Sequence, residues 1–173
     1  MNVDIKSFEK LYKEYSGFVY SVALRVSQNS ADAQEVTQDV FMKVYRGLKD
    51  FEGRSSLRTW IYRITVNTAL NQCRRSNRFP LTGEAYDFAV ETQAAQSSAS
   101  EAADEQDRKA RLAALLEALN PGQRAVIVLR EIEGLNYREI ASALNIPLNT
   151  VRSRLKRARE GLIGQGRKEA SVL

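Results

Sequence analysis

The sequence predicts an all-α protein made of two small helical domains joined by a flexible acidic linker. Apolar residues recur every three or four positions through most of the 173 residues, and no segment keeps the alternation of a strand. Residues 79–107 hold seven acids and no Lys or Arg, so the other residues carry +12 within a net charge of +5. This acidic segment lacks a sustained apolar period and therefore has no face to pack. We expect domains at 1–79 and 108–173, with the linker at 80–107.

Two amphipathic helices begin the first domain. Apolar side chains at helical spacing place one helix over residues 6–27 and the next over 31–48. Asn29 or Ser30 can accept hydrogen bonds from the free amides at the start of the second helix.

A third helix completes the first domain. The serine pair at 55–56 offers a cap for it, and Pro80 ends it. Its core stripe is expected to be Leu57, Trp60, Ile61 and Ile64.

Four helices are expected in the second domain, starting with a leucine-rich helix from Arg108. Asn120 and Pro121 then supply a cap and a first-turn proline for the next helix. Asn136 and Glu139 have the spacing of a capping box for the third, with Asn in place of the usual Ser or Thr. The last helix is expected over residues 149–164.

Composition argues against an enzyme and for a cytoplasmic protein. Cys73 is the only cysteine and there is no histidine, which excludes an internal disulfide and leaves a poor supply of metal ligands. We find no catalytic constellation and no phosphate-cradling glycine loop, and so we expect no cofactor. The chain shows neither a signal peptide nor the ~20 apolar residues of a membrane span.

The last two expected helices, separated by a turn of about four residues, have the arrangement of a helix-turn-helix, whose second helix enters the DNA major groove. Here the second helix is basic, opposed only by Glu160. Guanidinium groups suit both phosphates and guanine edges. The alternative is a solvated charged face, but the position on the second helix favours DNA binding. The basic residues are Arg152, Arg154, Lys156, Arg157 and Arg159.

Three segments resemble, in order, conserved regions of the extracytoplasmic-function (ECF) sigma factors of the sigma-70 family. DAQEVTQDVFMKVYRGL resembles region 2.2, FEGRSSLRTWIYRITVN resembles region 2.3 and the start of region 2.4, and NYREIASALNIPLNTVRSRLKRARE resembles region 4.2. The likeness covers most of residues 8–166. It implies a protein that binds core RNA polymerase and directs promoter-specific transcription initiation at minus-10 and minus-35 elements.

The resemblance implies two contacts with core polymerase, at the clamp coiled coil of its largest subunit and at its flap. It assigns the clamp contact to region 2.2, where the polar positions lie off the apolar stripe and surround Phe41. Phe41 is either an exposed interface anchor or a core residue beside Tyr45. The positions that match the family's polymerase-binding residues are Asp32, Glu35, Gln38, Asp39, Phe41 and Arg46.

Contacts to the minus-10 element are also implied by the resemblance. The loop 51–56 matches the family's pocket for a base flipped out of the stack, or else is an ordinary glycine turn. Trp60 is expected in the core or packed beneath the DNA-binding face. The matching residues are Phe51, Arg54, Ser55, Arg63, Asn67, Asn71, Arg74 and Arg75.

The helix-turn-helix is expected to bind the minus-35 element, with base contacts from its early turns. The resemblance further implies that the acidic linker runs through the polymerase channel that later holds RNA. It also implies control by an anti-sigma factor, whether membrane-anchored or not, without insertion of this chain in the membrane. The residues expected at the minus-35 element are Arg152, Ser153, Arg154, Lys156, Arg157 and Arg159.

Two other classes of DNA-binding protein share a basic C-terminal helix-turn-helix. A response regulator would need strands alternating with helices in its first half, and that pattern is absent. A stand-alone transcription factor would not need the region 2 pattern. The ordered region 2 and region 4 motifs therefore favour a sigma factor.

Overall fold

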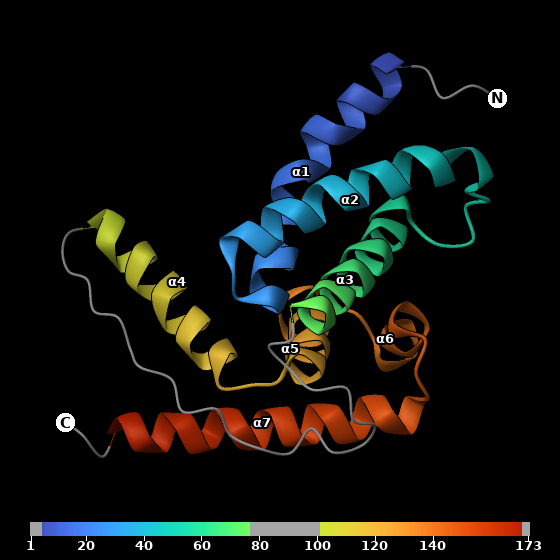
Figure 1. Ribbon diagram of the computed structural model, residues 1–173. Coiled ribbons are helices and arrows are strands. Elements are labelled where there is room, and N and C mark those ends of the chain that lie inside the picture. The colour runs from blue at the N-terminus through green and yellow to red at the C-terminus, as the bar shows by residue number, and fades with distance from the viewer. Residues whose placement is uncertain (1–4, 77–100, 171–173) are drawn as a thin grey trace.

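The computed structural model describes residues 5–76 and 101–170, with side chains for 6–76 and 107–165. These residues form helices joined by short turns (Figure 1). The all-α prediction is confirmed. The elements are α1 (Ile5–Ser27), α2 (Ser30–Gly47), a 3₁₀ turn η1 (Leu48–Asp50), α3 (Leu57–Arg75), α4 (Glu101–Glu117), α5 (Pro121–Ile127), a π-helical turn η2 (Val128–Ile132), α6 (Tyr137–Leu144) and α7 (Leu148–Ala170).

Helix starts follow the capping residues of the sequence. Asn29 caps α2 by accepting from the Asp32 amide, and Ser56 caps α3 by accepting from the Thr59 amide. Capping boxes at Asn120 and Asn136 begin α5 and α6. Each cap satisfies amides that lack a partner in the first turn.

Two helix boundaries differ from the prediction. The expected linker ran to Asp107, whereas α4 begins at Glu101, so the helix starts seven residues before the expected Arg108. These residues are Glu, Ala, Asp and Gln, whose acids favour a helix N-terminus although they supply no apolar stripe. Helix α7 extends past 164 to Ala170. The expected linker residues 80–100 and the Pro80 helix end lie outside the described residues.

The first three helices enclose a core of their own. Its buried side chains come from α1, α2 and α3, and the largest of them include Val19, Val26, Val36, Val40 and Ile61. Most are β-branched, and their spacing of three or four residues gives each helix one apolar face. Residues of the first three helices therefore pack closely on one another.

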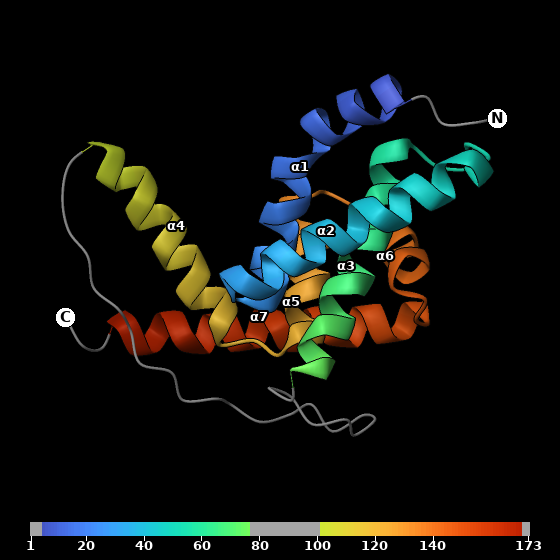
Figure 2. The same cartoon turned by 45° about the horizontal axis from the view of Figure 1, so that its top comes forward.

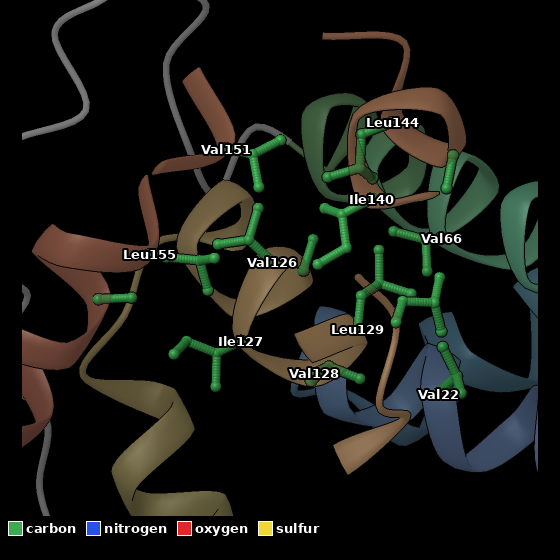
Figure 3. Close-up of a cluster of buried hydrophobic side chains, with 14 of the residues drawn as sticks. Val22, Val66, Val126, Ile127, Val128, Leu129, Ile140, Leu144, Val151 and Leu155 are labelled. Atoms are coloured by element: carbon green, nitrogen blue, oxygen red, sulfur yellow. The ribbon is translucent and has the colours of Figure 1, made fainter. Parts of the chain in front are cut away.

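A second cluster joins the C-terminal helices to the first three. Figure 3 shows Val126, Leu129, Ile140 and Leu155 packed together, with Val22 and Val66 from the first half at their edge. Figure 2 shows α5 between α3 and α7. The two halves therefore share buried apolar surface in this conformation.

Within residues 5–76 and 101–170, no helix combines the length and hydropathy that crossing a bilayer requires.

Candidate nucleic-acid interface

The α6–α7 pair is a helix-turn-helix whose turn is fixed by backbone hydrogen bonds. Asn145 ends α6 in the left-handed conformation, with φ of 52°, which asparagine tolerates better than most residues. The Ile146 amide donates to the Ala141 carbonyl at 3.0 Å. Val151, Leu155 and Ala158 anchor α7 in the core, so the opposite face of α7 turns outward.

Four of the six expected minus-35 residues form an exposed basic face on the early turns of α7. Arg152 donates to the Asn149 side chain at 3.2 Å, and the Ser153 hydroxyl donates to the Thr150 carbonyl at 3.1 Å. Lys156 lies 3.9 Å from the Glu160 carboxylate. We call the exposed residues Arg152, Ser153, Lys156 and Arg157 the α7 basic face.

The other two arginines of α7 lie differently. Arg154 is half-buried against α3 and does not share the exposed face. Burial lowers the pKa of Arg154, and the charge of Arg74 lowers it further. Arg159 forms an ion pair with Glu131 at 2.7 Å. The hydrogen bonds to Glu131 and Tyr137 raise the pKa of Arg159.

Most of the expected minus-10 residues line one exposed side of α3. Arg63, Asn71, Arg74 and Arg75 are exposed, and Arg74 donates to the Asn71 side chain at 3.0 Å. Asn67 is already engaged, because its amide donates to the Arg63 carbonyl at 2.8 Å and to the Ala143 carbonyl of α6 at 2.7 Å. In this arrangement α6 covers the centre of the predicted minus-10 surface.

The loop before α3 leaves little of its aromatic surface free. The Phe51 ring packs on Trp60 with centroids 5.2 Å apart, while Arg54 is paired with Glu52 and Ser55 is exposed. Trp60 also fills the space beside Gly47, where an added Cβ would lie 3.0 Å from its ring. Trp60 is therefore packed between this loop and Gly47 of α2.

The six expected polymerase-binding residues divide into surface and buried groups. Glu35, Gln38 and Arg46 are exposed, and Asp39 is half-buried. Asp32 is 8% exposed and lies in the first turn of α2, where its carboxylate suits the helix dipole. Its contacts are local to the fold, so it does not present an open binding group.

Phe41 is a core residue, and its interpretation as an exposed anchor is wrong. It is 4% exposed, with its ring centroid 4.6 Å from that of Tyr12 and 6.3 Å from that of Phe8. Tyr45, which the alternative placed in the core with it, is instead 46% exposed. Phe41 thus widens the buried face that Val40 and Val44 form on α2.

An apolar patch that the sequence analysis missed surrounds Phe41. Tyr12, Met42 and Tyr45 are exposed by 46%, 53% and 46%, respectively. Residues 42 and 45 are three apart on α2, and so they share a face. That spacing, next to the polar candidates Gln38, Asp39 and Arg46, was a signal that could have identified the patch.

Glu133 joins the two halves and was also missed. Its carboxylate, 7% exposed, lies 3.6 Å from Arg25 of α1 and 3.8 Å from Arg58 of α3, and the Tyr62 hydroxyl donates to it. Desolvation raises the pKa of Glu133, although both arginines oppose the shift. We call Glu133, Arg25, Arg58 and Tyr62 the Glu133 junction.

Family comparisons match both halves of the chain. A model of sigma-70 region 2 matches residues 11–79, and a model of sigma-70 region 4 matches residues 109–162. The RNA polymerase sigma-H factor of Pseudomonas aeruginosa is 34% identical over 165 residues, covering 92% of this chain and 86% of that protein. The sigma-E factor of Escherichia coli K12 matches with the same identity and coverage.

Solved structures share the fold. CnrH in complex with the cytosolic domain of CnrY aligns with a TM-score of 0.62 and 24% identity over 92% of this chain and 87% of that one. The sigma factor RpoE of Bartonella quintana, bound to the anti-sigma factor NepR, aligns with a TM-score of 0.63 and 24% identity over 91% of this chain and 95% of that one.

These matches define the class of the protein. It is a helical protein in which region 2 precedes region 4, and region 4 contains a basic helix-turn-helix. The chain belongs to the sigma-70 family of RNA polymerase sigma factors. Its relatives place it in the ECF group. It is thus a non-enzymatic subunit that binds core RNA polymerase and promoter DNA and directs promoter-specific initiation, which confirms the predicted function.

Proposed function

We propose that the α7 basic face reads the minus-35 element and that α3 with the preceding loop meets the minus-10 element. The observation that carries this proposal is the exposed run of Arg152, Ser153, Lys156 and Arg157 on the second helix of a capped helix-turn-helix. Arginine can donate two hydrogen bonds to guanine O6 and N7 in the major groove. In this proposal Lys156 holds a flanking phosphate, with Ser153 beside the base contacts.

Promoter recognition requires the two halves to separate from the arrangement seen here. The minus-10 and minus-35 elements lie ~25 base pairs apart, which is ~85 Å at ~3.4 Å per base pair. Asn67 of the minus-10 surface, in contrast, is hydrogen-bonded to Ala143 of the helix-turn-helix at 2.7 Å. We therefore treat residues 1–79 and 108–173 as two domains that act as separate bodies on DNA.

Core polymerase is expected to dock on the outer face of α2. Gln38, Asp39 and Arg46 supply polar contacts, and Met42 and Tyr45 supply apolar surface beside them. Exposed apolar side chains within a polar rim are typical of a binding site. We include Glu35 in the same proposed polymerase-binding surface, although the Gln72 side chain already donates a hydrogen bond to its carboxylate at 2.7 Å.

We also propose that the protein acts in the cytoplasm under the control of an anti-sigma factor. The likeness to a sigma factor solved with its anti-sigma factor supports this idea. An inhibitor that keeps the two domains together would prevent them from spanning a promoter.

Base preference at the minus-35 element tests the central assignment. Arg157→Ala and Arg152→Ala should each reduce transcription from promoters with an intact minus-35 element and flatten the preference at one base pair, by ~1–3 kcal/mol of discrimination. Binding to core polymerase should be unchanged.

Arg159→Ala is the matched control on the same helix. Arg159 is held by Glu131, and any DNA contact it makes would be to a phosphate, so this variant should lower affinity and salt dependence without changing base preference. A minus-35 profile that both Arg152→Ala and Arg157→Ala leave unaltered would show that α7 does not read this element.

A further inference from the structure

A polar cavity of about 520 Å³ lies where the two domains meet. The α3 helix contributes Leu70, Cys73 and Arg74 to its wall, and α7 contributes Thr150, Ser153, Arg154 and Arg157. The α5 segment Asn120–Gln123 closes the side between them. A cavity of this size falls in the range that small-molecule sites occupy, ~300–1,000 Å³.

The described residues that line this cavity carry positive charge only. Three arginines line it, and the lining residues in the described part of the chain include no acid. Arg74 donates to the neutral Asn71 side chain. By contrast, Arg25, Arg58 and Arg159 each have a carboxylate within 4 Å.

Of the three arginines in the lining, Arg154 lies in the position least favourable for a positive charge. Its guanidinium lies beside Gly122, where an added Cβ would meet it at 3.5 Å, and burial together with the charge of Arg74 lowers its pKa. No ion pair to Arg154 occurs within the described residues. A half-buried cation near a second cation is unfavourable, and an anion between them offsets the repulsion.

Neutral donors complete the lining. The Thr150 hydroxyl lies on the first turn of α7, whereas the Ser153 hydroxyl already donates to the Thr150 carbonyl. The Gln123 side chain uses its oxygen to accept from the Asn120 amide at 3.1 Å, which leaves its NH₂ group to donate. Hydroxyl, amide and guanidinium donors together suit the oxygens of a phosphate group. Arginine forks bind such oxygens in pairs.

We propose that this cavity binds a small anion of the diphosphate class, which bridges Arg74 of the first domain and Arg154 and Arg157 of the second. The bound anion favours the closed arrangement, because its charge joins arginines from both halves. It thereby competes with promoter binding, which needs Arg157 free of the anion and the domains apart. This site would make the sigma factor sensitive to the concentration of a free phosphorylated metabolite.

Calorimetric titration of the full chain with inorganic pyrophosphate, at constant ionic strength, tests the proposal. The wild type should bind pyrophosphate and show a raised melting temperature. Arg154→Gln and Arg74→Gln should each weaken binding at least tenfold. Arg138→Gln removes the same charge from the exposed surface of α6 and should bind as the wild type does. Using two variants from different helices guards against a folding defect in one of them.

Several results would overturn the site. The site is ruled out if the wild type no longer binds pyrophosphate once ionic strength is matched. It is also ruled out if the wild type and the three variants bind pyrophosphate with equal affinity. If pyrophosphate does not bind while both pocket variants lose affinity for promoter DNA, the arginines serve DNA phosphates only and the proposal fails. Guanosine and adenosine diphosphates, titrated in parallel, show whether a base adds to the affinity of the diphosphate itself.

Discussion

At the scale of single residues, Glu133 is an acid whose pKa is set by the residues packed around it. Its carboxylate is almost fully covered, it faces Arg25 of α1 and Arg58 and Tyr62 of α3, and its pKa is raised above the ordinary 4.5 because desolvation outweighs both arginines. A raised pKa means that the closed state binds a proton more readily than the open one. Closure is therefore favoured by mild acid.

Glu133→Gln should remove this pH dependence. In the wild type, the contribution of Glu133 to closure is fully present below pH 4.5 and is lost as the pH rises through the raised pKa. The glutamine variant cannot titrate and so should show a flatter dependence over this window. Melting temperatures measured at intervals from pH 4.5 to 7.5 would check this, and equal slopes for the two proteins would contradict it.

Phe41 and Met42 are adjacent in the sequence but have different roles. Phe41→Ala opens a cavity under α1 and should cost ~3–5 kcal/mol of unfolding free energy. Met42, 53% exposed, should change stability by less than ~0.5 kcal/mol when replaced by Ala, yet weaken binding to core polymerase by ~1 kcal/mol or more. Urea unfolding and core-binding titrations on both variants separate the roles. A Met42→Ala protein with unchanged polymerase affinity would remove the exposed patch from the interface.

At the scale of secondary-structure elements, the helix-turn-helix depends on the capping box of α6. The Asn136 side chain accepts from the amides of Arg138 and Glu139, and the Glu139 carboxylate accepts from the Asn136 amide at 2.7 Å. Asn136→Ala should cost ~1 kcal/mol in unfolding free energy. Ser142→Ala, at an exposed position of the same helix, is the control and should cost less. Equal losses would mean that the cap contributes nothing specific.

Local chemistry explains why most elements could be predicted. Asn29, Ser56, Asn120 and Asn136 each satisfy the first amides of a helix through their own side chain, which is an interaction between near neighbours in sequence. The basic residues of α7 likewise stand close together in the sequence, so the basic helix could be predicted. Nothing in these features depends on distant parts of the chain.

The errors arose where tertiary packing decides the outcome. Phe41 is buried because α1 crosses α2 and presents Phe8 and Tyr12 to it, which the α2 sequence alone does not contain. Arg154 turns toward α3 for the same reason, and Glu133 gains its partners only when the domains meet. Contacts between residues this far apart in sequence leave no periodic signal in either segment.

At the scale of the whole molecule, the two domains share a hydrophobic cluster, and α6 of the second domain covers Asn67 of the predicted minus-10 surface. Holding the promoter requires this cluster to open. Donor and acceptor dyes on cysteines introduced by Lys10→Cys and Arg138→Cys, in a Cys73→Ser background, would report the separation. Energy transfer should be high in the free protein and should fall when holoenzyme binds a promoter. Unchanged transfer on promoter binding would contradict the opening.

The central claim is that this chain alone gives core RNA polymerase its choice of promoters. Adding the purified protein to core polymerase on genomic DNA, and sequencing the 5′ ends of the transcripts, measures that choice directly. We predict start sites that core polymerase alone does not use, each preceded by a shared pair of elements near minus-10 and minus-35, with the minus-35 preference flattened in Arg157→Ala. A set of start sites that is the same with and without the protein would contradict the account.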